Sequence, residues 1–227
     1  MRENTAPAFR EAFARGADAA EMDVRRTADG VLVVHHDPEI AGAGPIIQMT
    51  RAEVVEAAPW VPDLEHALAA CAGMWVNVEL KNSPADPDWD ESHQAAHLTA
   101  AVLREAGPVD RYLVSSFNPD TIGVFATVFP EVRTGWLSDV GVEPLQATRL
   151  AAEAGHASIH PYVDAMAGEK AEAVVAAAAA AGLLVIVWTV DDADEMRRLA
   201  AAGVDGIITN RPVVARSAFE DRDGDGG

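Results

Sequence analysis

The chain has 227 residues, a length that suits one large α/β domain. Its 36 acidic residues outnumber the 17 basic ones and give a net charge of −19, which argues against binding to nucleic acid or to an anionic membrane, since both need surfaces rich in Lys and Arg. Cys71 is the only cysteine, so an internal disulfide and a cysteine-based zinc site are excluded.

The N-terminal part of the sequence predicts a helix, a strand and a short return strand. The helix follows Thr5, whose hydroxyl suits the N-cap, and it ends at Gly16. A strand is predicted at 19–24, and the turn sequence 27–30 leads into a second apolar run at 31–36. Because a parallel crossover needs about a dozen connecting residues, we expect 31–36 to return antiparallel to the strand before it.

Helices and strands alternate along the rest of the chain. Helices are predicted near 50–58, 64–72, 92–105, 120–128, 142–154, 169–181 and 193–202. Strands are predicted at 75–81, 112–116, 133–137, 157–160, 184–190 and 206–209. Such alternation is typical of a parallel sheet covered by helices. With 19–24 the count is seven parallel strands, one fewer than a closed (β/α)8 barrel has, and the missing strand would precede the first helix.

The domain and membrane predictions follow from the same pattern. We expect residues 1–218 to form a single α/β barrel domain and 219–227 to be a disordered acidic tail. The longest apolar run, 173–188, has 16 residues and is divided by Gly182, whereas a membrane span needs about 20. We therefore expect a cytoplasmic protein with no integral membrane segment; a signal peptide encoded upstream of Met1 would change that location.

Two predicted strands carry charged side chains where buried strands normally carry apolar ones. Glu21 and Asp23 share one face of the first strand, because side chains alternate. By the same rule Asn77, Glu79 and Lys81 share one face of the second. Uncompensated buried carboxylates are too costly for a strand to hold, so the pattern predicts a cation, an anionic ligand such as a phosphate, or both. Oxygen ligands favour Mg²⁺ or Ca²⁺. The alternative is an internal ion pair of Glu79 with Lys81 alone.

The return strand ends in two histidines. Adjacent side chains on a strand point to opposite faces, so at most one of His35 and His36 faces a site with the acids. A histidine there could act as a general acid on the leaving alkoxide of a phosphodiester, and a structural hydrogen-bonding role is an equal alternative. Further candidates for a substrate wall stand at predicted strand ends, although buried aromatic residues are more often core. They are Ser115, Ser116, Phe117, Asn118, His160, Pro161, Trp188 and Thr189.

Several motifs taken together resemble the glycerophosphodiester phosphodiesterase family. The first half of the chain contains Arg2-Glu3-Asn4-Thr5, Gly16-Ala17-Asp18, Glu21-Met22-Asp23-Val24, Val34-His35-His36-Asp37 and Val78-Glu79-Leu80-Lys81. Ser115-Ser116-Phe117, Val187-Trp188-Thr189-Val190 and Gly203-Val204-Asp205-Gly206 followed by Thr209-Asn210-Arg211-Pro212 come later. The match keeps the family's order from residue 2 to about 213, and this makes it specific.

The resemblance implies a (β/α)8 TIM-type barrel with a metal-dependent active site at the carboxyl ends of its strands. The implied metal is Mg²⁺ or Ca²⁺, and the implied partner is a small-molecule glycerophosphodiester. The implied site residues are Glu21, Asp23 and Glu79 as metal ligands, His36 and Lys81 as catalytic residues, and Lys81, Phe117 and Trp188 as substrate-binding residues.

The chain also departs from the family pattern. Family members begin with a strand that ends His-Arg-Gly shortly before the Glu-Asn-Thr motif, and this sequence starts after it, at Met1-Arg2-Glu3. A second acid/base histidine and a phosphate-binding arginine are therefore missing from the printed sequence, as a start codon assigned too far downstream would explain. The segment 39–44 is shorter than the family's. We expect the chain as printed to expose strand edges at 19–24 and 206–209, to be marginally soluble and to be inactive.

The resulting hypothesis is a metal-dependent phosphodiesterase that hydrolyses glycerophosphodiesters to glycerol 3-phosphate and an alcohol. In the complete enzyme one histidine would deprotonate the glycerol hydroxyl next to the phosphate, which attacks and forms a cyclic phosphate, while His36 protonates the leaving alcohol. Water then opens the cyclic phosphate. Two alternatives stay open: a catalytically silent barrel that binds phosphodiesters, and a lysophospholipase D-like activity.

Overall fold

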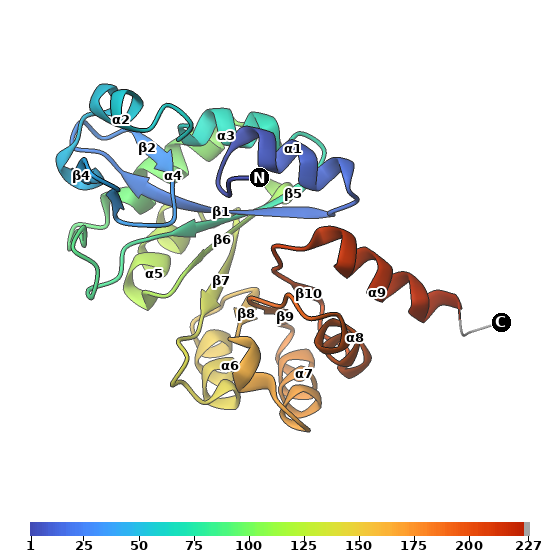
Figure 1. The fold of residues 1–227 in the computed structure, drawn as a ribbon. Helices are drawn as coiled ribbons and strands as arrows, with labels where there is room; N and C mark the ends of the chain where they lie inside the picture. The colour runs from blue at the N-terminus through green and yellow to red at the C-terminus, as the bar shows by residue number, and fades with distance from the viewer. Residues whose placement is uncertain (225–227) are drawn as a thin grey trace. The chain divides into compact units, whose positions relative to one another are not determined.

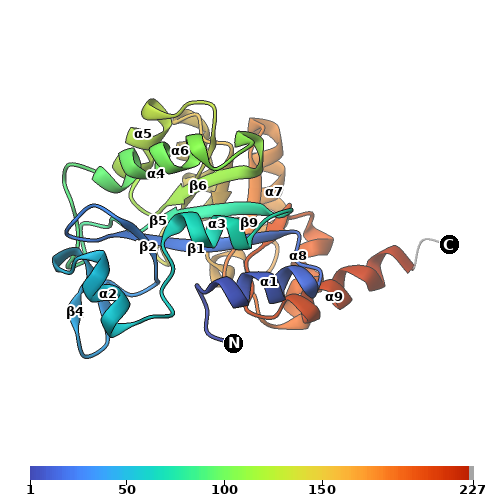
Figure 2. The ribbon, with the colours of Figure 1, turned by 90° about the horizontal axis from the view of Figure 1, so that it is seen from above.

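The computed structural model describes the backbone of residues 1–224 and the side chains of residues 1–219. The chain divides into two compact units (Figures 1 and 2). Unit 1 comprises Met1–Ala14 and Asp18–Arg133, and unit 2 comprises Arg15–Ala17 and the chain from Thr134 onwards. The division falls inside residues 1–218, which the sequence predicts to be one domain. That they form a single domain stays a prediction.

The sheet of unit 1 has the strand order β6–β5–β1–β2. The strands β1 (Ala19–Arg26), β5 (Trp75–Leu80) and β6 (Tyr112–Ser116) run parallel. β2 (Leu32–Val34) pairs antiparallel with the end of β1, which confirms the predicted return strand. The other elements of unit 1 are α1 (Ala6–Ala14), β3 (Glu39–Ile40), β4 (Gly44–Pro45), η1 (Ile46–Gln48), α2 (Arg51–Ala57), α3 (Leu64–Ala70), α4 (Gln94–Glu105), η2 (Val109–Arg111) and α5 (Pro119–Val128).

The two faces of this sheet differ in character. Met22, Val24 and Val78 are fully buried in a core to which α1, α3, α4 and α5 contribute. Within it, α1 lies beside α3 and α4 beside α5 (Figure 1). Because side chains alternate along a strand, the residues between these core positions, among them Glu21 and Asp23, point to the opposite face. The sheet therefore has one apolar, helix-covered face and one polar face.

The segment that follows β2 has a small core of its own. It is formed by Val33, Ile40, Ile46, Met49, Val54, Ala58 and Val61. α2 begins at a capping box, in which the Thr50 hydroxyl accepts from the Glu53 N–H and the Glu53 carboxylate accepts from the Thr50 N–H. The hairpin of β3 and β4 is not predicted from the sequence, because two-residue strands show no alternation; Gly42 and Gly44, with φ of 80° and 113°, permit its turn.

Unit 2 continues the strand–helix alternation in the parallel order β10–β9–β8–β7. Its strands are β7 (Arg133–Leu137), β8 (Ser158–His160), β9 (Leu184–Val187) and β10 (Gly206–Ile207). Its helices are α6 (Pro144–Glu153), η3 (Val163–Met166), α7 (Lys170–Ala181), α8 (Ala193–Ala202) and α9 (Pro212–Gly224). Among the described residues, three parallel strands in unit 1 and four in unit 2 give the seven predicted. In the part of the chain that the structure describes, no helix is long and apolar enough to cross a membrane.

The end of α9 differs from the prediction. The sequence predicted a disordered tail from residue 219, whereas the helix continues to Gly224. Neither proline nor glycine occurs between Val213 and Asp223, so the backbone carries no signal that would end the helix earlier. Residues 225–227 of the predicted tail lie outside the described residues.

Candidate active site

Three carboxylates meet on the polar face of the unit 1 sheet. Glu21 and Asp23 lie on β1, and Glu79 lies on β5 as the register partner of Asp23. One oxygen of each residue lies within 4.8 Å of the corresponding oxygens of the other two. Such a separation suits ligands that each lie about 2.0–2.6 Å from one Mg²⁺ or Ca²⁺ ion. Strand alternation predicts this convergence, because both strands run parallel and present these residues to the same face.

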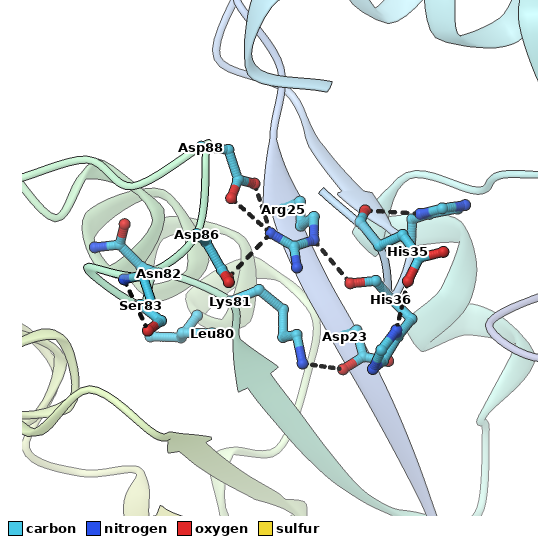
Figure 3. Close-up of polar contacts among 12 residues, drawn as sticks. Asp23, Arg25, His35, His36, Leu80, Lys81, Asn82, Ser83, Asp86 and Asp88 are labelled. Carbon is cyan, nitrogen blue, oxygen red and sulfur yellow. Dashed lines mark hydrogen bonds and ion pairs between the residues drawn. The ribbon is translucent and has the colours of Figure 1, made fainter. Parts of the chain in front are cut away.

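Lys81 brings a positive charge to the three acids. Its Nζ lies 2.9 Å from Glu79 Oε1 and 3.4 Å from Asp23 Oδ1 (Figure 3 shows the contact with Asp23). The same Nζ lies 5.8 Å from the centroid of the Phe117 ring, so this aromatic residue is close to the cluster. The predicted alternative of an internal ion pair is therefore partly realised. One lysine against three carboxylates still leaves a surplus of negative charge.

The surplus charge and the burial of the cluster raise the pKa values of its two glutamates. Burial raises the pKa of Glu21 well above its usual value, and the charges of Asp23 and Glu79 raise it further. Burial, and then Asp23, raises the pKa of Glu79 to about 7, although Lys81 opposes the shift. Glu21 Oε1 is buried and has no hydrogen-bond partner among the described residues. An orphaned carboxylate oxygen beside two further carboxylates fits a divalent cation that takes oxygen ligands.

Asn4 holds Asp23 in place. Its Nδ2 donates to Asp23 Oδ2 at 2.7 Å, and its Oδ1 accepts from the Asp23 backbone N–H at 3.2 Å. Asn4 adopts a φ of 53°, a left-handed conformation that asparagine tolerates better than most residues. Asn4 has no role predicted from the sequence, although it belongs to the motif Arg2-Glu3-Asn4-Thr5. Its place in that motif was the signal that could have found it.

The structure distinguishes the two histidines that follow β2. His36 Nδ1 lies 2.8 Å from Asp37 Oδ1, the ring is 58% exposed, and its charge acts to lower the pKa of Glu79. The bond with His36 in turn lowers the pKa of Asp37. His35 instead places its Nδ1 2.9 Å from the Asp37 carbonyl oxygen. Both rings therefore engage Asp37 through Nδ1, and His36 is the more exposed of the two.

Arg25 extends the polar face of β1 beyond Asp23. Its side chain is 2% exposed, and its Nη1 donates to both carboxylate oxygens of Asp88, at 2.7 and 2.6 Å. Its Nε donates to the carbonyl oxygen of His36 at 2.9 Å (Figure 3). Arg25 is not among the site residues predicted from the sequence. Its place two residues after Asp23, on the same face of the strand, was the signal that could have found it.

The remaining candidates from the sequence have contacts within their own unit. In unit 1, Ser116 Oγ donates to the Leu80 carbonyl at 2.9 Å, and Asn118 caps α5. In unit 2, Trp188 Nε1 donates to the His160 carbonyl at 2.9 Å, and the Trp188 ring lies 4.9 Å from that of Tyr162. The substrate-binding roles predicted for Phe117 and Trp188 stay predictions.

Comparison with known families gives a single answer over nearly the whole chain. The sequence profile of the glycerophosphoryl diester phosphodiesterase family matches residues 1–214. A glycerophosphodiester phosphodiesterase of Caldanaerobacter subterraneus subsp. tengcongensis is 31% identical over 92% of this chain and 89% of its own length. One from Bacillus altitudinis is 30% identical over 92% of this chain and 89% of its own.

Solved structures agree with the sequence comparison. A glycerophosphodiester phosphodiesterase from Parabacteroides distasonis superposes with a TM-score of 0.83 at 26% identity, over 97% of this chain and 91% of that one. An Oleispira antarctica phosphodiesterase in complex with the product sn-glycerol-3-phosphate has the same fold, with a TM-score of 0.82 at 24% identity over 96% of this chain and 91% of that one.

Proposed function

The chain belongs to the glycerophosphoryl diester phosphodiesterase family, and we propose that it hydrolyses small glycerophosphodiesters to glycerol 3-phosphate and an alcohol in a reaction that depends on a divalent metal. Its fold class is accordingly α/β, of the phosphodiesterase TIM-barrel kind, and its reaction class is phosphoric diester hydrolysis. The product sn-glycerol-3-phosphate in the Oleispira antarctica structure supports the choice of substrate.

The observation that carries the proposal is the convergence of Glu21, Asp23 and Glu79 within 4.8 Å. These are the three acids that the family resemblance marks as metal ligands. Burying them together without an ion raises the pKa values of both glutamates, which means that the folded protein holds them at an energetic cost. A site kept at such a cost favours a function over a structural role.

The three acids would hold Mg²⁺ or Ca²⁺, the ions that suit a set of carboxylate oxygens. When bound, such an ion supplies positive charge that stabilises the negative charge developing on the phosphate oxygens. Asn4 keeps Asp23 oriented for this role through its two hydrogen bonds. Lys81, shared between Glu79 and Asp23, is close enough to donate to a phosphate oxygen.

His36 would act as the general acid. With Nδ1 engaged by Asp37, the imidazole presents Nε2, from which a proton can pass to the oxygen of the leaving alcohol. The bond to Asp37 also limits rotation of the ring. Phe117, next to Lys81, would supply an apolar contact for the glycerol carbons, and Trp188 is proposed as a second apolar contact.

The test measures release of glycerol 3-phosphate from glycerophosphocholine with added Mg²⁺ or Ca²⁺, by the protein that also carries the family's strand ending His-Arg-Gly ahead of Met1. We expect turnover that chelation abolishes and that Glu21→Gln lowers strongly. Glu65→Gln, on the exposed surface of α3, is the matched control and should behave as the unchanged protein. Isothermal titration with the metal alone gives a second readout, in which Glu21→Gln weakens binding. Binding of glycerophosphocholine without turnover would favour the silent binding barrel instead.

A further inference from the structure

Arg25 links three parts of unit 1 that are distant in sequence. It lies on β1, its Nη1 bonds both oxygens of Asp88, and its Nε bonds the backbone carbonyl of His36. Asp86 approaches the same guanidinium at 3.6 Å (Figure 3). The arginine and Asp88 side chains are only 2% and 3% exposed, so solvent hardly screens their interaction. A guanidinium makes these bonds from two nitrogens held in one rigid plane, whereas an ammonium group has a single nitrogen at the end of a flexible chain.

The bond to the His36 carbonyl holds a segment that lies beyond the end of the sheet. β2 ends at Val34, and His35 is tied back by its N–H to the Asp23 carbonyl at 2.9 Å. The next residue, His36, is held instead by the bond from Arg25 Nε to its backbone carbonyl. The His36 ring is 58% exposed, so packing does little to fix it. Its backbone position therefore decides where Nε2 can reach.

The loop that carries Asp88 is anchored without Arg25. Asn82 Nδ2 donates to the Asp90 carbonyl at 2.9 Å, and the Asp90 N–H donates to Asn82 Oδ1 at 2.8 Å. Asn82 also donates to Thr121 Oγ1 of α5 at 3.0 Å. Arg25 is thus not needed to order this loop. Asp88 is held in place by its own loop, and the guanidinium bonded to it can therefore hold the segment that contains His36.

We propose that Arg25 is a positioning residue for the general acid of this enzyme: anchored by Asp88, it fixes the His36 backbone so that Nε2 reaches the leaving-group oxygen. This inference rests on the proposed function, and specifically on His36 as the acid. Misplacing a reacting group by about 1 Å can cost up to about 100-fold in rate. Loss of the bond should therefore slow only the steps that need the acid.

Leaving-group dependence tests the proposal. Glycerophosphocholine releases an alkoxide that needs a proton, whereas the p-nitrophenyl ester of glycerol 3-phosphate releases a stable phenolate that does not. The test variant is Arg25→Lys, which keeps a positive charge for Asp88 and removes the second nitrogen, the one that bonds the His36 carbonyl. Arg26→Lys is the matched control, because Arg26 pairs with Asp90 on the opposite face of the strand. Asp88→Asn keeps an acceptor for Nη1 and removes the ion pair.

We expect Arg25→Lys to lower kcat on glycerophosphocholine at least about tenfold, with KM unchanged, and to change kcat on the nitrophenyl ester by less than about threefold. His36→Gln should show the same selectivity with a larger loss. Arg26→Lys should stay close to the unchanged protein on both esters, whereas Asp88→Asn, which weakens the anchor of Arg25, should show the selectivity of Arg25→Lys with a smaller loss. Equal losses on both esters in Arg25→Lys, or no loss, would overturn the inference. So would a loss in Asp88→Asn that is equal on the two esters.

A second measurement needs no turnover. Backbone order parameters of the His36 and Asp37 amides should fall from about 0.85 to below about 0.6 in Arg25→Lys and stay high in Arg26→Lys. Unchanged order parameters would show that Arg25 does not hold the His36 backbone, and would overturn the inference. If the unchanged protein hydrolyses neither ester, the proposed function fails, and the order parameters still decide whether Arg25 holds His36. If His36→Gln affects both esters alike, His36 is not the acid and the inference falls with that role.

Discussion

On the polar face of unit 1, three carboxylates share one lysine, whereas unit 2 buries a polar pair that carries no charge. That pair is His160 and Ser158 of β8, whose Nε2 and Oγ lie 2.8 Å apart. Burial lowers the pKa of His160 to about 3, so the ring is neutral at ordinary pH. The pair is accommodated because β7 has Gly135 beside it: an added Cβ would lie 2.3 Å from Ser158 Oγ and 2.7 Å from His160 Nε2.

The difference shows how a functional site can be told from a structural one. The pair in unit 2 fits by shape and keeps its groups neutral, so it needs no ligand to be compatible with folding. The acids of unit 1 hold surplus charge at raised pKa values. Among the described residues Glu21 Oε1 and His160 Nδ1 both lack a hydrogen-bond partner, so the charge, and not an unpaired atom, separates the two sites. Adding a cation should therefore stabilise unit 1 and leave the pair in unit 2 unaffected.

The largest effect is expected from Glu79→Ala. Turnover of glycerophosphocholine should fall at least about 1,000-fold, because several kcal/mol of charge stabilisation are lost with the metal. The melting temperature without metal should stay equal or rise, since removing one acid relieves repulsion among the others. Turnover assays and thermal scans without metal measure the two effects. Activity retained at saturating Mg²⁺ and Ca²⁺ would remove Glu79 from the site.

The pH dependence of stability should separate the charged cluster from the neutral pair. The pKa of Glu79 rises from 4.5 to about 7 on folding, so the folded state binds this proton more tightly than the unfolded state. Its contribution to the free energy of unfolding is therefore fully present below pH 4.5 and is lost as pH rises towards 7, by about 3 kcal/mol. Urea titrations of the metal-free protein should show this loss, and Glu79→Gln should reduce it. Identical pH profiles for both proteins would contradict the shift.

Asn4→Ala should weaken the unit 1 site without removing a ligand. Metal affinity should fall about 10- to 100-fold, because Asp23 loses the donor that orients its carboxylate. Calorimetric titration with Mg²⁺ or Ca²⁺ measures this. Thr5→Ala is the control: it removes the hydroxyl that accepts from the Ala8 N–H at the start of α1 and leaves Asp23 untouched. If both variants bind metal equally well, Asn4 does not support the site.

Gly135→Ala should affect only the neutral pair of unit 2. The clash of the new methyl group with Ser158 and His160 should lower the free energy of unfolding by about 1–3 kcal/mol, with unchanged metal affinity. Gly123→Ala, in α5, meets no atom within 4 Å and should raise stability by about 0.5–1 kcal/mol. Denaturant unfolding distinguishes the two. A neutral result for Gly135→Ala would show that the pair can rearrange.

Local patterns predicted much of the fold and the centre of the site. β6, β7 and α8 have the predicted bounds, because alternation, helical periodicity and flanking glycines act over a few residues. Two features were missed. The hairpin of β3 and β4 has strands too short to show a periodic pattern, and the extension of α9 to Gly224 depends on the absence of a residue that ends a helix. The convergence of Glu21 with Glu79 followed from strand alternation plus parallel pairing.

The sequence by itself determined which residues face the polar side of the unit 1 sheet, because a two-residue period is a property of the chain alone. It also determined the family, through motifs kept in order from residue 2 to about 213. Only the tertiary structure decided that Asn4 holds Asp23 across 19 residues and that Arg25 joins Asp88 across 63. Such pairs depend on the path of the backbone between their partners, and no local period of the sequence encodes that path.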